Sequence, residues 1–365
     1  MPTIDFKSTG RKGFTLVELM VAIGVTALLV SLMLTITLNV MGGWNKSSGS
    51  LTSGNQARLV LDMIARDLQG AVIKKDGNAW LAASIQQNQT LGGDAGMAND
   101  ASWAATGTIK PAAADSLSIP TMSGSIPPDV EGYRFGQAGT WLRFFTSITD
   151  TNTADTSGGS TTDTHVSAPR AVSYQIIRAP VVFGSLEYRY QLFRAEVSSE
   201  NSFSAGYDLF ATAYNSIAPV TETSVSTTIK GAGIIRRPET AANDRRLVIA
   251  NNVIDFGVRM YTRNTSKYSV QLAFPLTTAK LGFAATIPSA TVPAPVPTPA
   301  PTSGAIAYDY GIPIVVEVFM RVLTDEGVLQ IDNLENGRIT GDWWDIAIKN
   351  SKVFTRRVEL NSAGL

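Results

Sequence analysis

Residues that could do chemistry are scarce in this chain, and the most unusual of them is a lone carboxylate. There is no cysteine and only one histidine, His165, so disulfides and thiolate chemistry are excluded and a conventional catalytic triad is disfavoured. Glu18, by contrast, lies inside the apolar run "FTLVELMVAIGV", directly behind Arg11, Lys12 and a glycine. A carboxylate in an apolar membrane segment is costly unless it is paired or protonated. We therefore treat Glu18 as a functional residue that needs a cation.

The other acidic residues form no recognisable site. Asp150, Asp155 and Asp163 share a Ser/Thr/Gly-rich stretch with His165, but they lack the spacing of a calcium-binding loop. The sequence also has no glycine-rich nucleotide-binding pattern and no G-x-S-x-G turn. We expect solvated loop side chains here, and no catalytic residue, metal site, cofactor or enzymatic activity.

An aromatic pair near the C-terminus has two interpretations. Trp343 and Trp344 are flanked by Asp342 and Asp345. Such a group can form a carbohydrate-facing patch, but a buried aromatic anchor beside the last strands is commoner.

The length, hydrophobic content and charge balance of the chain indicate what class of protein it is. With 365 residues, 44% of them hydrophobic, the chain can form a sizeable core, so most of it should be globular. The 30 basic and 30 acidic residues cancel and form no long run of one sign. A nucleic acid is therefore not expected as a partner.

One segment is long and apolar enough to cross a membrane. No charged residue occurs in residues 19–44, and residues 14–41 are dominated by aliphatic side chains. As a helix, residues 14–41 would span roughly 42 Å, more than the ~30 Å hydrocarbon core of a bilayer. Three basic residues precede this segment and only Lys46 closely follows it. The positive-inside bias thus places the N-terminus in the cytoplasm and exports the remainder.

The residues ahead of the span reverse the order of a secretory signal, in which small residues follow the apolar region. Here Gly13 stands between the basic leader and Phe14. The stretch "GFTLVELMVAIGVTALLV" resembles the N-terminal motif of type IV prepilins and of type II secretion pseudopilins. This resemblance covers some 30 residues. It implies that a prepilin peptidase cleaves between Gly13 and Phe14 and that Phe14 becomes the N-methylated first residue.

The resemblance also implies a role for Glu18. The new amine at Phe14 is one helical turn away, and in an assembling filament the amine of a neighbouring subunit is the better partner. The glutamate of the family is thought to bring subunits into register by neutralising this amine. The alternative is that Glu18 merely snorkels to the cytoplasmic headgroups.

The pattern and the resemblance together divide the chain into four parts. We expect a cytoplasmic leader at 1–13, a transmembrane assembly helix at 14–43, an amphipathic second half of the helix at 44–75, and a β-rich extracytoplasmic head at 76–365. Gly42 and Gly43 weaken a helix and predict a bend or soft joint. Trp44 suits the outer membrane interface.

In the second half of the helix, apolar residues recur at helical spacing. The apolar stripe comprises Val60, Leu61, Ile64, Leu68, Ala71 and Val72. The polar residues expected mostly to face away are Arg58, Asp62, Arg66, Asp67 and Gln69. The pattern predicts a helix that lies on the head.

Six segments rich in β-branched and aromatic residues predict strands in the head. They are residues 140–148, 170–178, 185–197, 251–263, 268–274 and 312–324. We expect one antiparallel sheet with a face on the helix, which gives an α+β, pilin-like fold. Long insertions interrupt the strands: a Ser/Thr-rich loop at 149–165, a second Ser/Thr stretch near 221–228, and a Pro-rich insertion at 286–304 that should be extended or disordered.

Two further likenesses concern the subtype. The order of "ARLVLDMIARDLQGAV", "VSYQIIR", "YQLFRAEV" and "VIDFGVRMY" is similar to that of J-type minor pseudopilins. The C-terminal "VVEVFMRVLTDEGVLQI" and "DWWDIAIKNSKVFTRRVEL" resemble the large cassette protein C of Verrucomicrobia, and the chain length fits that group better.

Two functions of different class follow from the sequence. In the first, the chain is a minor structural subunit of a type II secretion or type IV pilus-like filament, held as a single-pass inner-membrane protein until it assembles. Its partners would be prepilin peptidase, other pilin or pseudopilin subunits, the inner-membrane assembly platform and, before assembly, membrane lipid. In the second, the head is a binding or adhesion module on a pilin stem and recognises a surface or a secreted substrate.

Overall fold

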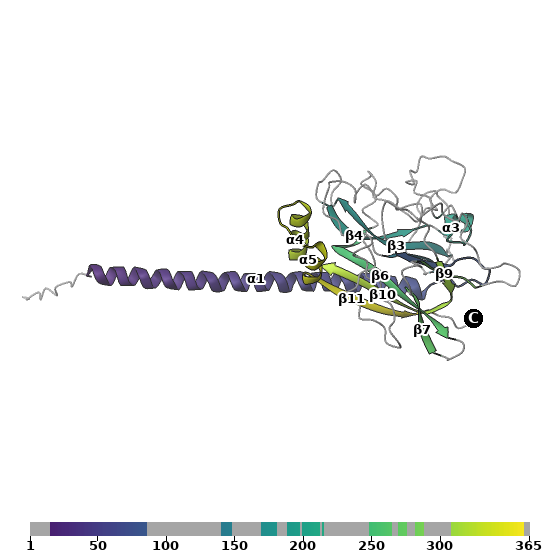
Figure 1. Cartoon of the computed structure of the whole chain (residues 1–365), viewed down its shortest axis with the longest axis horizontal. Coiled ribbons are helices and arrows are strands. Elements are labelled where there is room, and N and C mark those ends of the chain that lie inside the picture. The colour runs from purple at the N-terminus through teal and green to yellow at the C-terminus, as the bar shows by residue number, and fades with distance from the viewer. Residues whose placement is uncertain are drawn as a thin grey trace, which may run out of the picture. The chain divides into compact units, whose positions relative to one another are not determined.

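The fold joins one long N-terminal helix to a β-rich head (Figure 1). The computed structural model describes residues 15–85, 140–147, 169–180, 188–197, 199–211, 214, 248–264, 269–275, 282–287 and 308–360. The chain forms two compact units, Met1–Leu51 and Thr52–Leu365. Helix α1 (Leu16–Gln69) begins in the first unit and ends in the second. The predicted α+β class, a long N-terminal helix followed by a β-sheet head, is confirmed.

Helix α1 continues through Gly42 and Gly43 without an interruption of helical structure, although the sequence predicts a joint there. In its second half the stripe residues Val60, Leu61, Ile64 and Leu68 are buried. The prediction is wrong for Ala71 and Val72, which follow the end of α1 at Gln69 and are only partly buried. The exposed face carries the expected polar residues Arg58, Asp62, Arg66 and Gln69. The prediction is wrong for Asp67, which is 2% exposed.

The larger sheet of the head has seven strands. Their order is β5 (Val248–Asn251), β4 (Tyr188–Glu196), β3 (Arg170–Pro180), β2 (Thr140–Thr146), β1 (Leu81–Ile85), β8 (Gly282–Ala285) and β9 (Tyr308–Gly311). Neighbouring strands are antiparallel except β8 and β9, which run parallel.

The smaller sheet has four antiparallel strands in the order β11 (Ser351–Glu359), β10 (Pro313–Leu323), β6 (Val253–Asn264) and β7 (Ser269–Phe274). All six predicted strands are confirmed, but the prediction of one sheet is wrong. A twisted open sheet rarely exceeds about ten strands without splitting. Between β5 and β6 the chain passes from one sheet to the other at Asn252, whose φ of 62° suits asparagine better than most residues.

One hydrophobic core joins both sheets to the second half of α1. It includes Ile64 and Leu68 of α1, Phe144 and Tyr174 of the larger sheet, and Phe256 and Met320 of the smaller sheet. Figure 1 shows the teal strands β3 and β4 of the larger sheet and the green-to-yellow strands β6, β10 and β11 of the smaller one. The second half of α1 therefore shares one core with both sheets of the head.

Three short helices complete the described head: α3 (Ser199–Ala205), α4 (Asp325–Glu335) and α5 (Trp343–Lys349). Helices α4 and α5 connect β10 to β11. Each has a side-chain cap. The Thr324 hydroxyl accepts a hydrogen bond from the Gly327 N–H at 3.2 Å, and Asp342 accepts from the N–H groups of Trp344 and Asp345 at 2.8 and 2.9 Å.

Trp343 is the buried aromatic anchor that the sequence favours. It is 4% exposed, and its indole N–H donates to Glu335 Oε1 at 3.1 Å. The Tyr190 hydroxyl donates to the same oxygen, and the Tyr190 and Trp343 rings meet edge to face at 5.7 Å. The Glu335 carboxylate thus links α4, α5 and β4.

Gly327 permits the close approach of α4 to the end of α5. A Cβ atom added there would lie 2.7 Å from Asn350 Cβ and 2.8 Å from the Asn350 carbonyl oxygen. We expect Gly327→Ala to lower the free energy of unfolding by about 1–3 kcal/mol, because backbone must shift to admit the methyl group. Urea unfolding followed by tryptophan fluorescence measures the change.

Gly54→Ala is the matched control for this prediction. Its added Cβ would meet only the Phe354 ring, at an ordinary 3.8 Å, and alanine is favoured over glycine within a helix by about 1 kcal/mol. It should leave the head as stable as before or slightly more stable. A Gly327→Ala protein that unfolded at the same urea concentration as Gly54→Ala would contradict the close approach.

Candidate functional site

The start of α1 is organised by a reciprocal pair of hydrogen bonds between Thr15 and Glu18. Glu18 Oε2 accepts from the Thr15 backbone N–H at 2.9 Å and from the Thr15 hydroxyl at 3.0 Å. The Glu18 N–H in turn donates to Thr15 Oγ1 at 3.3 Å. This is a capping box, in which a Thr-x-x-Glu segment satisfies the N–H groups that a helix leaves open at its start. The Glu18 carboxylate is therefore directed back toward the beginning of the helix.

The position of the Glu18 carboxylate is relevant to its predicted role, which is to pair with an N-terminal amine. Thr15 is the residue next to Phe14, so a carboxylate held at the Thr15 N–H lies near the start of the chain that cleavage after Gly13 would create. Gly13 and Phe14 themselves lie outside the described residues. Cleavage between them, methylation of Phe14 and the pairing of Glu18 with an amine stay predictions.

Behind the capping box, α1 presents a predominantly apolar surface. Residues Leu16–Trp44 form a candidate membrane span of 29 residues, and its most apolar 18-residue stretch has a mean hydropathy of 2.5 and no buried residue. The hydroxyl groups of Thr26, Thr35 and Thr37 in this span bond to the backbone of the same helix. Thr35 Oγ1 donates to the Ser31 carbonyl at 2.9 Å, and Thr37 Oγ1 donates to the Met33 carbonyl at 2.8 Å. Hydroxyl groups paired in this way are tolerated in hydrocarbon.

The other end of α1 is fixed by a buried carboxylate, Asp67. Its Oδ2 accepts from Arg194 Nε at 2.9 Å and from the Tyr174 hydroxyl, both on the larger sheet. Its backbone carbonyl accepts from the Thr146 hydroxyl at 2.8 Å. A carboxylate in the last turn of a helix faces the negative end of the helix dipole, so it needs a cation nearby. Arg194 supplies that cation.

The charges extend from Asp67 along the larger sheet. Arg194 also pairs with Glu196 at 2.5 Å, and Glu196 pairs with Arg170. Burial and the neighbouring Asp67 raise the pKa of Tyr174 well above its ordinary value, which keeps its hydroxyl protonated as a donor. Burial acts to lower the pKa of Arg194, but the negative groups around it raise this pKa overall. The network keeps α1 and the sheet in one fixed relation.

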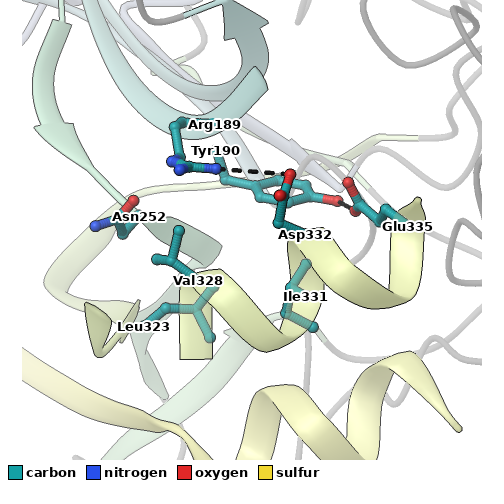
Figure 2. A pocket seen from close by; sticks show the side chains of 8 residues that line it. All are labelled: Arg189, Tyr190, Asn252, Leu323, Val328, Ile331, Asp332 and Glu335. Carbon is teal, nitrogen blue, oxygen red and sulfur yellow. Dashed lines mark hydrogen bonds and ion pairs between the residues drawn. The ribbon is translucent and has the colours of Figure 1, made fainter. Parts of the chain in front are cut away.

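A cavity of the head between α4 and β4 is too small to be a ligand site (Figure 2). It has a volume of about 10 Å³, room for roughly one water molecule. Arg189 and Asp332 face each other there at 3.9 Å, and Glu335 is bonded to Tyr190. Among the described residues, no group of three His, Cys, Asp or Glu side chains is placed to hold a metal ion.

Comparison with known protein families identifies the type of N-terminal segment that this chain carries. Residues 8–34 match the family model described as the prokaryotic N-terminal methylation motif. The chain has a prepilin-type N-terminus. This motif implies processing by a prepilin peptidase and assembly with other pilin subunits through the N-terminal helix. The matched residues include Gly13, Phe14 and Glu18. Comparisons with curated proteins and with solved structures give no match.

The sequence predicts the N-terminal motif, but it does not predict the structural roles of Thr15 and Asp67. The motif was recognisable because it is contiguous. Thr15 was missed, although Thr-x-x-Glu ahead of an apolar run is itself a capping signal. Asp67 was assigned to the exposed face, although it lies seven residues after Val60 and three after Ile64, both on the buried stripe.

Proposed function

We propose that this chain is a structural subunit of the minor pseudopilin kind in a type II secretion or type IV pilus-like filament, with no catalytic activity of its own. One observation supports the proposal most strongly. A prepilin-type motif at residues 8–34 includes the start of an apolar helix, and the residues of this helix from Leu16 to Trp44 are exposed in the described structure. The oversized head suits a minor subunit of the J-type or cassette-C kind.

The helix surface explains why such a chain would assemble. The large apolar side chains of α1 from Leu16 to Val40 are at least 55% exposed and are distributed all around the helix. Apolar surface of this extent needs lipid or other helices around it. Lipid covers it while the chain is in the inner membrane, and neighbouring subunits cover it in the filament.

The proposal includes a location and a set of partners. The N-terminus lies in the cytoplasm and the head outside the inner membrane, as the basic residues before the span favour. Prepilin peptidase processes the chain, the inner-membrane assembly platform inserts it, and other pilin or pseudopilin subunits surround its helix. Glu18 neutralises the amine at Phe14 of a neighbouring subunit during insertion.

Mechanical shearing of cells tests the proposal. Filaments are released by shear, whereas inner-membrane proteins are retained with the cells. We expect the protein in the sheared fraction together with other subunits, and we expect it only in the membrane fraction of cells without prepilin peptidase. A processed protein that remained in the membrane of filament-producing cells would contradict assembly and favour the binding-module alternative.

A further inference from the structure

Strand β11 lies at the edge of the smaller sheet. It pairs with β10 along its whole length, from Ser351 opposite Leu323 to Glu359 opposite Val315. No described strand pairs with its other side. An edge strand presents a row of backbone N–H and C=O groups that can bind another strand. The polypeptide backbone of β11 therefore offers a template for an added strand.

A cleft lies over the first half of β11, between α5 and the end of β10. Its volume is about 420 Å³, within the roughly 300–1,000 Å³ typical of binding sites. The lining residues are Arg321, Ile348, Ser351, Lys352, Val353, Phe354 and Thr355. Ile348 of α5 is 37% exposed and gives the cleft an apolar wall. The cleft can thus accept side chains beside a backbone that pairs with β11.

The cleft is held open by contacts of the folded head. Arg321 donates to Ser351 Oγ at 3.2 Å, and its guanidinium lies 5.2 Å from the centre of the Trp344 ring. Phe354 lies close to Gly54 of α1 and packs against the main core. These residues are positioned before any partner arrives, which lowers the entropic cost of binding.

The edge carries an excess of positive charge. Lys349, Lys352, Arg356 and Arg357 are exposed, whereas Glu359 is the one acidic residue of β11. Arg356 contacts Asp62 of α1 at 3.4 Å, but both side chains are more than half exposed, so this pair is weak. Two copies of β11 side by side would bring like charges together, which is unfavourable across a strand pair. An acidic segment is favoured instead.

We propose that β11 and its cleft bind an extended, acidic segment of another protein, which adds to the smaller sheet as a fifth strand. The main chain of the segment pairs with the β11 edge, and its apolar side chains enter the cleft beside Ile348 and Val353. Its carboxylates face Lys352 and Arg356, which share the face of β11 opposite to Val353. Strand addition of this kind takes affinity from backbone hydrogen bonds and specificity from alternate side chains. The inference concerns the head alone and does not depend on filament assembly.

The test uses the full chain in detergent micelles and a fluorescent nine-residue peptide of alternating valine and glutamate. We expect saturable binding by fluorescence anisotropy and slower hydrogen exchange of the amides of residues 351–359. Two control peptides have the same sequence and charge but carry N-methyl groups on alternate amides, on the odd-numbered residues in one and on the even-numbered residues in the other. Each control peptide can no longer donate hydrogen bonds along one of its two edges. One of the two control peptides should bind at least about tenfold more weakly.

Charge-reversal variants provide the second arm. Lys352→Glu with Arg356→Glu should weaken peptide binding at least about tenfold, because both cations that face the peptide's glutamates then carry the same charge as those glutamates. The control variant, Lys75→Glu with Arg263→Glu, has the same change in net charge at exposed positions outside the cleft. It should bind the peptide as tightly as the unaltered chain does. Circular dichroism checks that both variants keep the fold.

Each alternative outcome overturns the proposal in a recognisable way. Equal binding of both N-methylated peptides would mean that charge alone attracts the peptide. Binding of an anionic polysaccharide such as polygalacturonate with the same change in β11 amide exchange would assign the surface to sugar polymers. Equal effects of the two charge-reversal variants, or no binding of the valine–glutamate peptide at all, would exclude this edge as its site.

Discussion

Replacement of Asp67 by alanine should lower the free energy of unfolding of the head by about 3–5 kcal/mol. The Asp67 carboxylate is 2% exposed and accepts hydrogen bonds from Arg194 and from the Tyr174 hydroxyl. Without it, a largely buried guanidinium loses its main counter-charge and a buried phenol loses its acceptor. Urea unfolding of the full chain in detergent, followed by circular dichroism, measures the loss.

Asp62→Ala is the matched control, because it makes the same substitution on the same helix. Asp62 pairs with Arg356 at 3.4 Å, but the two side chains are 61% and 53% exposed. Such a surface pair contributes about 0–1 kcal/mol. Equal losses in Asp67→Ala and Asp62→Ala would show that the buried network does not stabilise the head. A double replacement of Asp67 and Arg194 should cost less than the sum of the two single ones.

Glu18→Val should leave processing of the N-terminus intact and reduce the amount of protein in sheared filaments at least about tenfold. Valine removes the one carboxylate that can neutralise an N-terminal amine within the apolar segment. The measurement is the ratio of protein in the filament and membrane fractions, with the N-terminus of each identified by mass spectrometry.

Glu18→Gln separates the two roles of this residue. Glutamine can keep the capping box with Thr15 but carries no charge, so helix formation is preserved while charge pairing is lost. We expect Glu18→Gln to assemble as poorly as Glu18→Val. Thr37→Val, which removes only a hydroxyl bonded within the helix, should assemble normally. Normal assembly of Glu18→Gln would mean that Glu18 acts only as a cap.

The sequence identifies the parts of the fold that have a strong local pattern. Strands such as β3 and β10 are rich in β-branched and aromatic residues and were predicted within a few residues of their observed ends. Strand β1, "LAASI", and strand β8, "GFAA", carry no such signal. They are strands because neighbours pair on both sides, which depends on context rather than propensity.

Some residues of the candidate site can likewise be predicted from a local pattern, and others cannot. Gly13, Phe14 and Glu18 are neighbours in the chain, so one short motif is enough to predict them. Asp67 and Arg194 are separated by 127 residues, and only the folded head brings them together. The free edge of β11 could not be predicted because it depends on the order of strands in the smaller sheet.

The central claim is that the N-terminal segment is trimmed and modified before the helix assembles. Mass spectrometry of the protein from cells with an active prepilin peptidase tests it directly. The account predicts a mature chain that begins at Phe14 with a methylated amine. A chain that still began at Met1 in those cells would contradict it.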